Sequence, residues 1–134
     1  MALEIWYDQE PDDDFHEGDP AIVVNTAEEL ETFIDRVVAA GRGAVAPPMI
    51  EVSIAGVQDS PVMQVGLGQE RGFIAYLATD GGWTAGDASR QDFVPYDYMG
   101  SVQEVPASAE VPTSEVRKGL RAFLETERRP EVVH

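Results

Sequence analysis

The sequence predicts a single α+β domain over residues 1–134, with an antiparallel β-sheet of about five to six strands and two main helices packed on it. Three observations lead to this fold class. Apolar residues recur at helical spacing in one segment of the first third of the chain and in another near its end. Between these segments, apolar and polar residues alternate as in half-buried strands. A length of 134 residues suits one domain.

The chain opens with a short strand and an acidic loop. Residues 3–7 are mostly apolar and predict the strand. Residues 8–20 hold a series of carboxylates together with Pro11 and Gly18, so we expect an exposed loop there. Residues 21–24, with the sequence Ala-Ile-Val-Val, indicate a second short strand.

The first helix has both a start signal and a stop signal. Thr26 and Glu29 have the spacing of a capping box, in which side chains satisfy free backbone N–H groups. Gly41 is a typical stop. The residues between them that share one apolar face are Leu30, Phe33, Ile34, Val37 and Val38.

The middle of the chain is predicted to be β. Residues 50–54 and 63–67 alternate, and residues 72–79 form a more continuous apolar run that suggests a central strand. Asp80-Gly81-Gly82 is a hairpin signal, because glycine accepts the positive φ that such turns need. Trp83 is expected to begin the return strand, and residues 92–104 to form one long extended stretch.

The second helix is expected over residues 113–125, where Val116, Leu120, Phe123 and Leu124 share a face. Gly119 weakens this helix by about 1 kcal/mol relative to alanine. Residues 131–133 suggest a last edge strand. Strands placed between two helices favour an antiparallel sheet with helices on one face.

The charge of the chain limits its partners. With 25 acidic and 9 basic residues the net charge is −16. Phosphate binding depends on Lys and Arg, so direct binding to nucleic acid or to an anionic membrane is not expected. A negative surface instead steers towards a basic partner, although it also serves solubility alone. With no cysteine, no secretory signal and no apolar run of the roughly 20 residues that span a bilayer, we expect a cytoplasmic protein.

No arrangement of reactive side chains stands out. The two histidines are His16 in the acidic loop and His134 at the end, which gives little support to a catalytic triad. Residues 12–17 are rich in metal-binding side chains but lack the register of a calcium-binding loop. Gly66 and Gly68 suit a hairpin better than a phosphate loop. We therefore expect no catalytic, cofactor or metal site.

Aromatic residues gather in the last part of the predicted sheet. Trp83, Phe93, Tyr96 and Tyr98 could fill the core or anchor an interface, and the sequence leaves both open. By alternation, Tyr96 and Tyr98 share a face with Val94 and Val102, while Phe93 faces the other side.

Several short motifs follow one another in a familiar order. They are Asp80-Gly81-Gly82-Trp83, Gly86-Asp87, Tyr96-Asp97-Tyr98-Met99-Gly100, Val105-Pro106, Val111-Pro112, Phe123 and Arg129-Pro130. In this order the sequence resembles the Imm-one family of immunity proteins from bacterial polymorphic-toxin systems, and is especially similar to its actinobacterial branch. The resemblance covers residues 22–133. It implies a protein that neutralises a toxin in the cell that makes it, and the toxins linked to this family are largely nucleic-acid deaminases.

This resemblance implies a non-catalytic protein whose partner is a cognate basic toxin domain. Acids of the loop and of the first helix (Glu28, Glu31 and Asp35) would steer that partner, and aromatics would anchor it. The residues that we expect to contact the partner are Asp12, Asp13, Asp14, Glu17, Trp83, Asp87, Tyr96 and Tyr98. Two alternatives stay open: a small regulatory or ligand-binding protein with a pocket between sheet and helix, and an enzyme that uses the acidic residues. The sequence does not decide between a monomer and a dimer.

Overall fold

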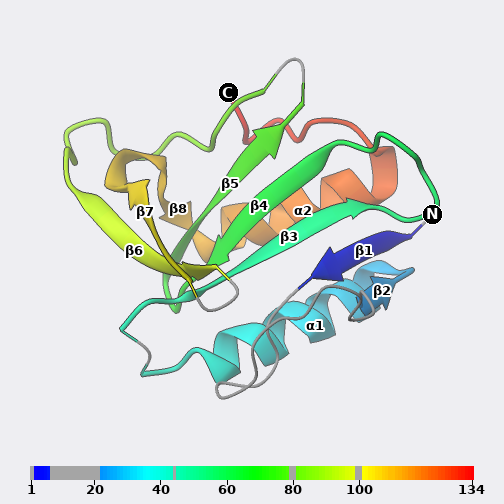
Figure 1. The fold of residues 1–134 in the computed structure, drawn as a ribbon, viewed down its shortest axis with the longest axis horizontal. Coiled ribbons are helices and arrows are strands. Elements are labelled where there is room, and N and C mark those ends of the chain that lie inside the picture. The colour runs from blue at the N-terminus through cyan, green and yellow to red at the C-terminus, as the bar shows by residue number, and fades with distance from the viewer. Residues whose placement is uncertain (1, 7–21, 44, 79–80, 99–100) are drawn as a thin grey trace.

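The computed structural model describes residues 2–6, 22–43, 45–78, 81–98 and 101–134. Over these residues the chain forms eight strands, two α-helices and one 3-10 helix (Figure 1). The strands are β1 (Leu3–Trp6), β2 (Ile22–Val24), β3 (Pro48–Ile54), β4 (Val62–Leu67), β5 (Arg71–Leu77), β6 (Phe93–Tyr98), β7 (Ser101–Pro106) and β8 (Val111–Pro112). The helices are α1 (Ala27–Ala40), η1 (Ala107–Ala109) and α2 (Thr113–Thr126).

One sheet runs through the molecule in the order β2-β1-β3-β4-β5-β8, with antiparallel neighbours throughout. β6 joins this sheet through a short parallel pairing with the start of β3, and β7 pairs with β6 as an antiparallel hairpin. The α+β class with an antiparallel sheet and two helices is therefore confirmed. The described residues contain more strands than the five to six expected. Two of these strands, β2 and β8, are very short, and the stretch at 92–104 divides into two strands.

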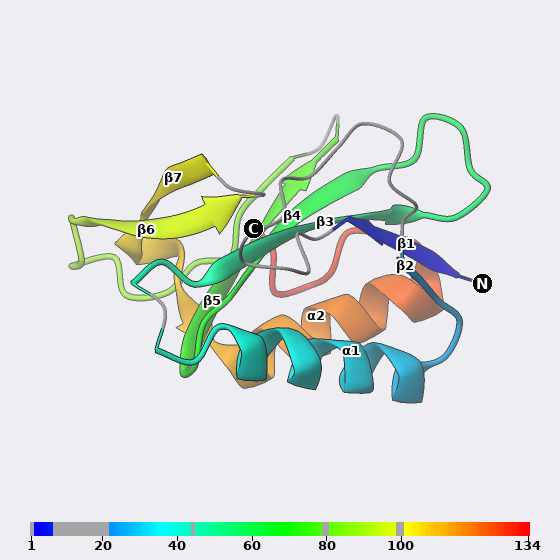
Figure 2. The same cartoon turned by 60° about the horizontal axis from the view of Figure 1, so that its bottom comes forward.

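Both α-helices cover the same face of the sheet, where they lie side by side (Figure 2). Their apolar faces meet the sheet in the main core, which includes Leu30 and Phe33 of α1 and Leu120 and Phe123 of α2. Burying such a side chain contributes roughly 1.5–3 kcal/mol, so this layer supplies most of the hydrophobic stabilisation. The helical periodicity of the sequence thus identified the larger core.

The predicted start and stop of α1 are confirmed. The Glu29 backbone N–H donates to Thr26 Oγ1 over 3.1 Å, as the capping box requires. The helix ends at Gly41, whose φ of −84° is open to any residue. A side chain at Gly41 would instead crowd Pro48, because an added Cβ would lie 2.7 Å from the Pro48 Cδ. The glycine therefore permits close packing rather than a left-handed turn.

The opposite face of the sheet carries a second, smaller core under the β6–β7 hairpin and η1. Its buried residues include Met49, Phe73, Tyr96, Val105 and Ala109. A Cβ at Gly66 would overlap the rings of Phe73 and Tyr96, so the strand position must be glycine. Gly68, which the sequence analysis assigned with Gly66 to a hairpin, donates its N–H to Arg71 O over 3.0 Å in the β4–β5 turn, as expected.

Two details of the predicted β6–β7 region are corrected. Residues 92–104 do not form one extended stretch, because β6 ends at Tyr98 and β7 begins at Ser101. The turn between them changes the alternation, so Val102 pairs with Asp97 and lies on the Phe93 face instead of the Tyr96 face.

The expected return strand at Trp83 and the expected edge strand at 131–133 are reduced to isolated bridges. Trp83 bridges to Ala75, and Thr84 bridges to Val133. Gly81 and Gly82 do have the positive φ that the turn signal predicts, 49° and 127°. The segment they lead into runs beside β5 without becoming a regular strand, and the C-terminal tail bridges to it at Thr84.

Candidate functional site

The predicted contact residues fall into two groups. Asp12, Asp13, Asp14 and Glu17, together with the whole acidic loop at 8–20, lie outside the residues that the structure describes. Trp83, Asp87, Tyr96 and Tyr98 are described, and they come from the segments that border or cover the sheet face opposite the helices.

Tyr96 belongs to the core. It is 1% exposed, and its ring meets Phe73 edge-on with the centroids 4.9 Å apart. Its hydroxyl donates to Glu110 Oε2 over 2.6 Å. Burial, followed by the bond to Glu110, raises the pKa of the tyrosine far above its ordinary value. Tyr96 therefore supports the surface from beneath and offers no contact area of its own.

Glu110 is the buried partner in this bond and was not predicted. It is 8% exposed, and its other carboxylate oxygen lies 3.1 Å from an Arg90 guanidinium nitrogen. A buried carboxylate is stable only when paired and hydrogen-bonded, and Tyr96 and Arg90 provide both conditions. The loop around Arg90, the hairpin and the end of η1 are thus fixed to one another.

Tyr98 lies at the margin of the second core. It is half-buried and donates its hydroxyl to Glu51 Oε1 over 2.9 Å. Desolvation, then the bond to Glu51, raises the pKa of Tyr98 to about 12. The neutral, hydrogen-bonded phenol is a polar contact point at the edge of the exposed surface.

Trp83 is the most exposed of the three aromatic residues predicted to contact the partner, at 43%. One face of its indole stacks on Phe73, with the centroids 5.8 Å apart and the planes inclined by 25°. Its backbone exchanges hydrogen bonds with His134, at 3.3 Å and 2.9 Å. A large aromatic side chain that is held from one side and open on the other suits an interface anchor.

Asp87 is fully exposed in the loop that follows Thr84. Its carboxylate accepts hydrogen bonds from the Ser89 N–H at 2.9 Å and from the Ser89 hydroxyl at 2.6 Å. These two bonds are the main reason that the pKa of Asp87 lies below its ordinary value. Asp87 therefore carries a fixed negative charge at neutral pH.

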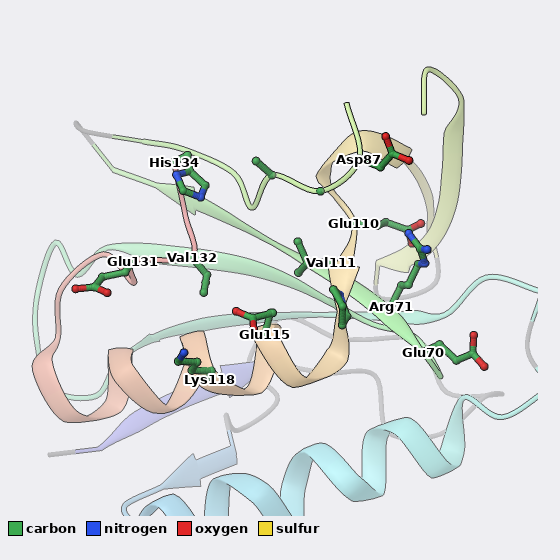
Figure 3. A pocket seen from close by; sticks show the side chains of 13 residues that line it. Glu70, Arg71, Asp87, Glu110, Val111, Glu115, Lys118, Glu131, Val132 and His134 are labelled. Atoms are coloured by element: carbon green, nitrogen blue, oxygen red, sulfur yellow. The ribbon is translucent and has the colours of Figure 1, made fainter. Parts of the chain in front are cut away.

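Asp87 also borders a surface pocket of about 790 Å³ between α2, the β5–β8 edge and the C-terminal tail (Figure 3). Glu115 and Lys118 line it from α2, and His134 lines it from the tail. Five acidic residues line this pocket (Glu70, Asp87, Glu110, Glu115 and Glu131), against two Lys or Arg residues (Arg71 and Lys118). The ligand-binding alternative calls for a closed, apolar cavity, whereas this pocket is charged and most of its lining residues are exposed.

The predicted steering acids of α1 are partly neutralised. Arg117 of α2 binds Glu31 at 2.6 Å and Asp35 at 2.7 Å, which joins the two helices. Glu28 is exposed in the first turn of the helix. Of the three helix acids, Glu31 and Asp35 thus have a structural role that the sequence analysis did not assign to them.

The outer face of the β6–β7 hairpin carries two of the most exposed large apolar side chains, Phe93 at 62% and Val102 at 66%. The sequence analysis placed Phe93 away from the tyrosines, and this is confirmed. It did not include either residue in the contact surface. The alternation of residues along β6 was enough to predict which face of the hairpin carries Phe93. The face that carries Val102 depends on where the turn between β6 and β7 lies.

The described part of the chain lacks both a metal-binding cluster and a helix that could span a membrane. Within it, no group of three or more His, Cys, Asp or Glu side chains is arranged to hold a metal ion. None of its helices is both long and apolar enough to cross a membrane.

Comparison with known protein families gives a match over most of the chain. The family model described as immunity protein Imm1 matches residues 18–134, nearly the whole chain. Trp83, Asp87, Tyr96 and Tyr98 lie inside the matched range, whereas Asp12, Asp13, Asp14 and Glu17 precede it. No curated protein matches the chain. The match agrees with the order of motifs and with the α+β fold, and it shows that the chain belongs to the Imm1 family of immunity proteins.

Proposed function

We propose that this protein neutralises a cognate toxin in the cytoplasm of the cell that makes it, by binding the toxin directly and without catalysing a reaction. The observation that carries the proposal is the family match over residues 18–134, since an immunity protein acts against a toxin. Direct binding suits a chain with a net charge of −16 and with exposed aromatic side chains at Trp83 and Phe93.

The proposed partner is a basic domain of a nucleic-acid-targeting toxin, of the deaminase type. A protein that acts on nucleic acid presents Lys and Arg to the phosphates. An inhibitor with a net charge of −16 is complementary to such a surface, and complementarity of this kind raises the association rate. The acidic loop, in this proposal, contributes to steering ahead of contact.

The distribution of charge suggests which side faces the toxin. Five of the nine basic residues cluster between positions 117 and 129, on α2 and the segment after it: Arg117, Lys118, Arg121, Arg128 and Arg129. Residues 91–116, which include β6, β7 and η1, contain acids and no Lys, Arg or His. A basic partner is therefore attracted to the hairpin side more than to the face of α2.

Co-expression tests this function. The partner is sought among toxin domains encoded beside the gene for this chain, and each is induced in a bacterial host with and without the protein. The proposal predicts that growth is restored and that the two chains elute as a 1:1 complex in size-exclusion chromatography with light scattering. Rescue without a complex would point to an indirect mechanism, and absence of rescue at equal expression would reject the function.

A further inference from the structure

The β6–β7 hairpin presents a surface that the fold does not use. Its cross-strand pairs Phe93–Pro106, Pro95–Glu104 and Asp97–Val102 place these six side chains on one face. The other face, with Tyr96 and Val105, packs on the sheet. Because side chains alternate along a strand, the first set points away from the molecule. This outer face combines strongly exposed apolar side chains with carboxylates, and it contains no basic residue.

The hairpin also has an open backbone edge. Among the described strands β7 pairs with β6 alone, so no described strand pairs with its second edge. The four consecutive residues 101–104 are all exposed, whereas the residues of a central strand alternate or are buried. An edge strand offers unpaired N–H and C=O groups to an incoming strand, which is the basis of β-augmentation.

The hairpin is held rigidly enough to serve as a platform. Tyr96 ties β6 to Glu110, and Tyr98 ties the end of β6 to Glu51 of β3. The Asp97 N–H donates to Pro47 O over 2.8 Å. In Figure 2 the hairpin lies on the side of the sheet away from both α-helices. A preorganised surface binds with a lower entropic cost than a flexible one.

We propose that the free edge of β7, with the outer face of the β6–β7 hairpin, binds an extended basic segment of the toxin as an added strand. The inference rests on the proposed function and names its contact surface. In this arrangement Phe93 and Val102 are buried by apolar side chains of the segment. Lys or Arg side chains of the segment reach Glu104 and Asp92, which lie at the exposed border of the surface.

The test uses the full-length protein, the neighbouring toxin domain, and the single variants Phe93→Ser and Val102→Ser. Each is expected to raise Kd by at least about tenfold, because truncating an interface anchor typically costs more than 1 kcal/mol. Val23→Ser is the matched control, since Val23 is 48% exposed on β2, an edge strand that β1 and β3 separate from the hairpin. It should leave Kd unchanged. Hydrogen exchange on the wild-type complex should show new protection of amides in residues 101–105, since Pro106 has no backbone N–H.

The outcomes separate the inference from the function it rests on. Wild-type binding that neither hairpin variant weakens, with no new protection in β7, would overturn the contact surface and leave toxin neutralisation standing. No binding by the wild type would reject both. A free protein that sediments as a dimer and becomes a monomer with Val102→Ser would show that a second copy occupies the edge, which also overturns the proposal.

Discussion

The Tyr96 hydroxyl donates a 2.6 Å hydrogen bond to Glu110, and this bond joins the β6–β7 hairpin to the residue that ends the 3-10 helix η1. Arg90 lies on the other oxygen of the same carboxylate. A buried acid thus fixes the position of three segments that follow one another in the chain. The exposed face of the hairpin, with Phe93 and Val102, takes its orientation from this arrangement.

Tyr96→Phe tests the structural value of this bond. The substitution keeps the ring against Phe73 but removes the donor to a buried carboxylate, which should lower the free energy of unfolding by about 1–3 kcal/mol. Urea denaturation measures the loss. Tyr98→Phe is the comparison, and its loss should be smaller because Tyr98 is only half-buried. Equal losses would show that burial of the Tyr96–Glu110 pair does not matter.

The raised tyrosine pKa values predict a decline of stability at alkaline pH. In the unfolded chain a tyrosine ionises near its ordinary pKa of about 10, whereas folding raises the pKa of Tyr98 to about 12. The unfolded state therefore loses its proton first, and the stabilisation, which is complete below pH 10, decreases as pH rises through this window. Denaturation at pH 9, 10 and 11 measures the slope. Tyr98→Phe should make it shallower, and an unchanged slope would contradict the assignment.

Gly66→Ala should destabilise the second core. The added Cβ overlaps the rings of Phe73 and Tyr96, and both rings are buried in the space between sheet and hairpin. Overpacking of this kind costs about 1–3 kcal/mol. Thermal unfolding followed by circular dichroism checks it. A variant as stable as the wild type would mean that the hairpin moves away from β4 without cost.

Arg117→Met should have a small, salt-sensitive effect on stability. It removes the ion pairs with Glu31 and Asp35 while keeping much of the aliphatic stem. Partly exposed pairs contribute about 0–1 kcal/mol each, so the total loss should stay near 1 kcal/mol and shrink at high salt. Lys118→Met, on the exposed side of α2, is the control for the change in net charge. If both variants lose the same stability, the helix-joining role of Arg117 is wrong.

Asp12, Asp13 and Asp14 changed together to Asn should slow association with the toxin and leave dissociation nearly unchanged. Charges outside the desolvated contact act on the encounter rate. Surface plasmon resonance separates the two rate constants. An effect confined to the dissociation rate would place the acidic loop inside the final contact, and no effect on either rate would remove it from the encounter.

The sequence predicted the elements with local signals better than those that depend on distant partners. The capping box at Thr26 and the periodicity that buries Leu30 and Phe33 located α1 correctly. The division of residues 92–104 into two strands was missed, because Tyr98 and Ser101 are both compatible with one extended run. Only the pairing of β6 with β7 reveals the turn between them.

The candidate site was predictable to a lesser extent. Trp83 was identified as an exposed aromatic residue, and the structure shows its outer face open. Glu110 could not be recognised, because a glutamate is almost never buried unless paired, and its partners Tyr96 and Arg90 come from separate segments. For Tyr96 the sequence left both core and interface open, and its buried bond to Glu110 decides for the core.

The most direct measurement of the central claim is a calorimetric titration of this protein into the neighbouring toxin domain at low and at high salt. The account predicts one molecule of protein per toxin domain, with an affinity that weakens as salt rises because opposite charges are screened. The absence of a complex at low salt, or an affinity that does not change with salt concentration, would contradict the claim that this acidic protein binds a basic toxin domain.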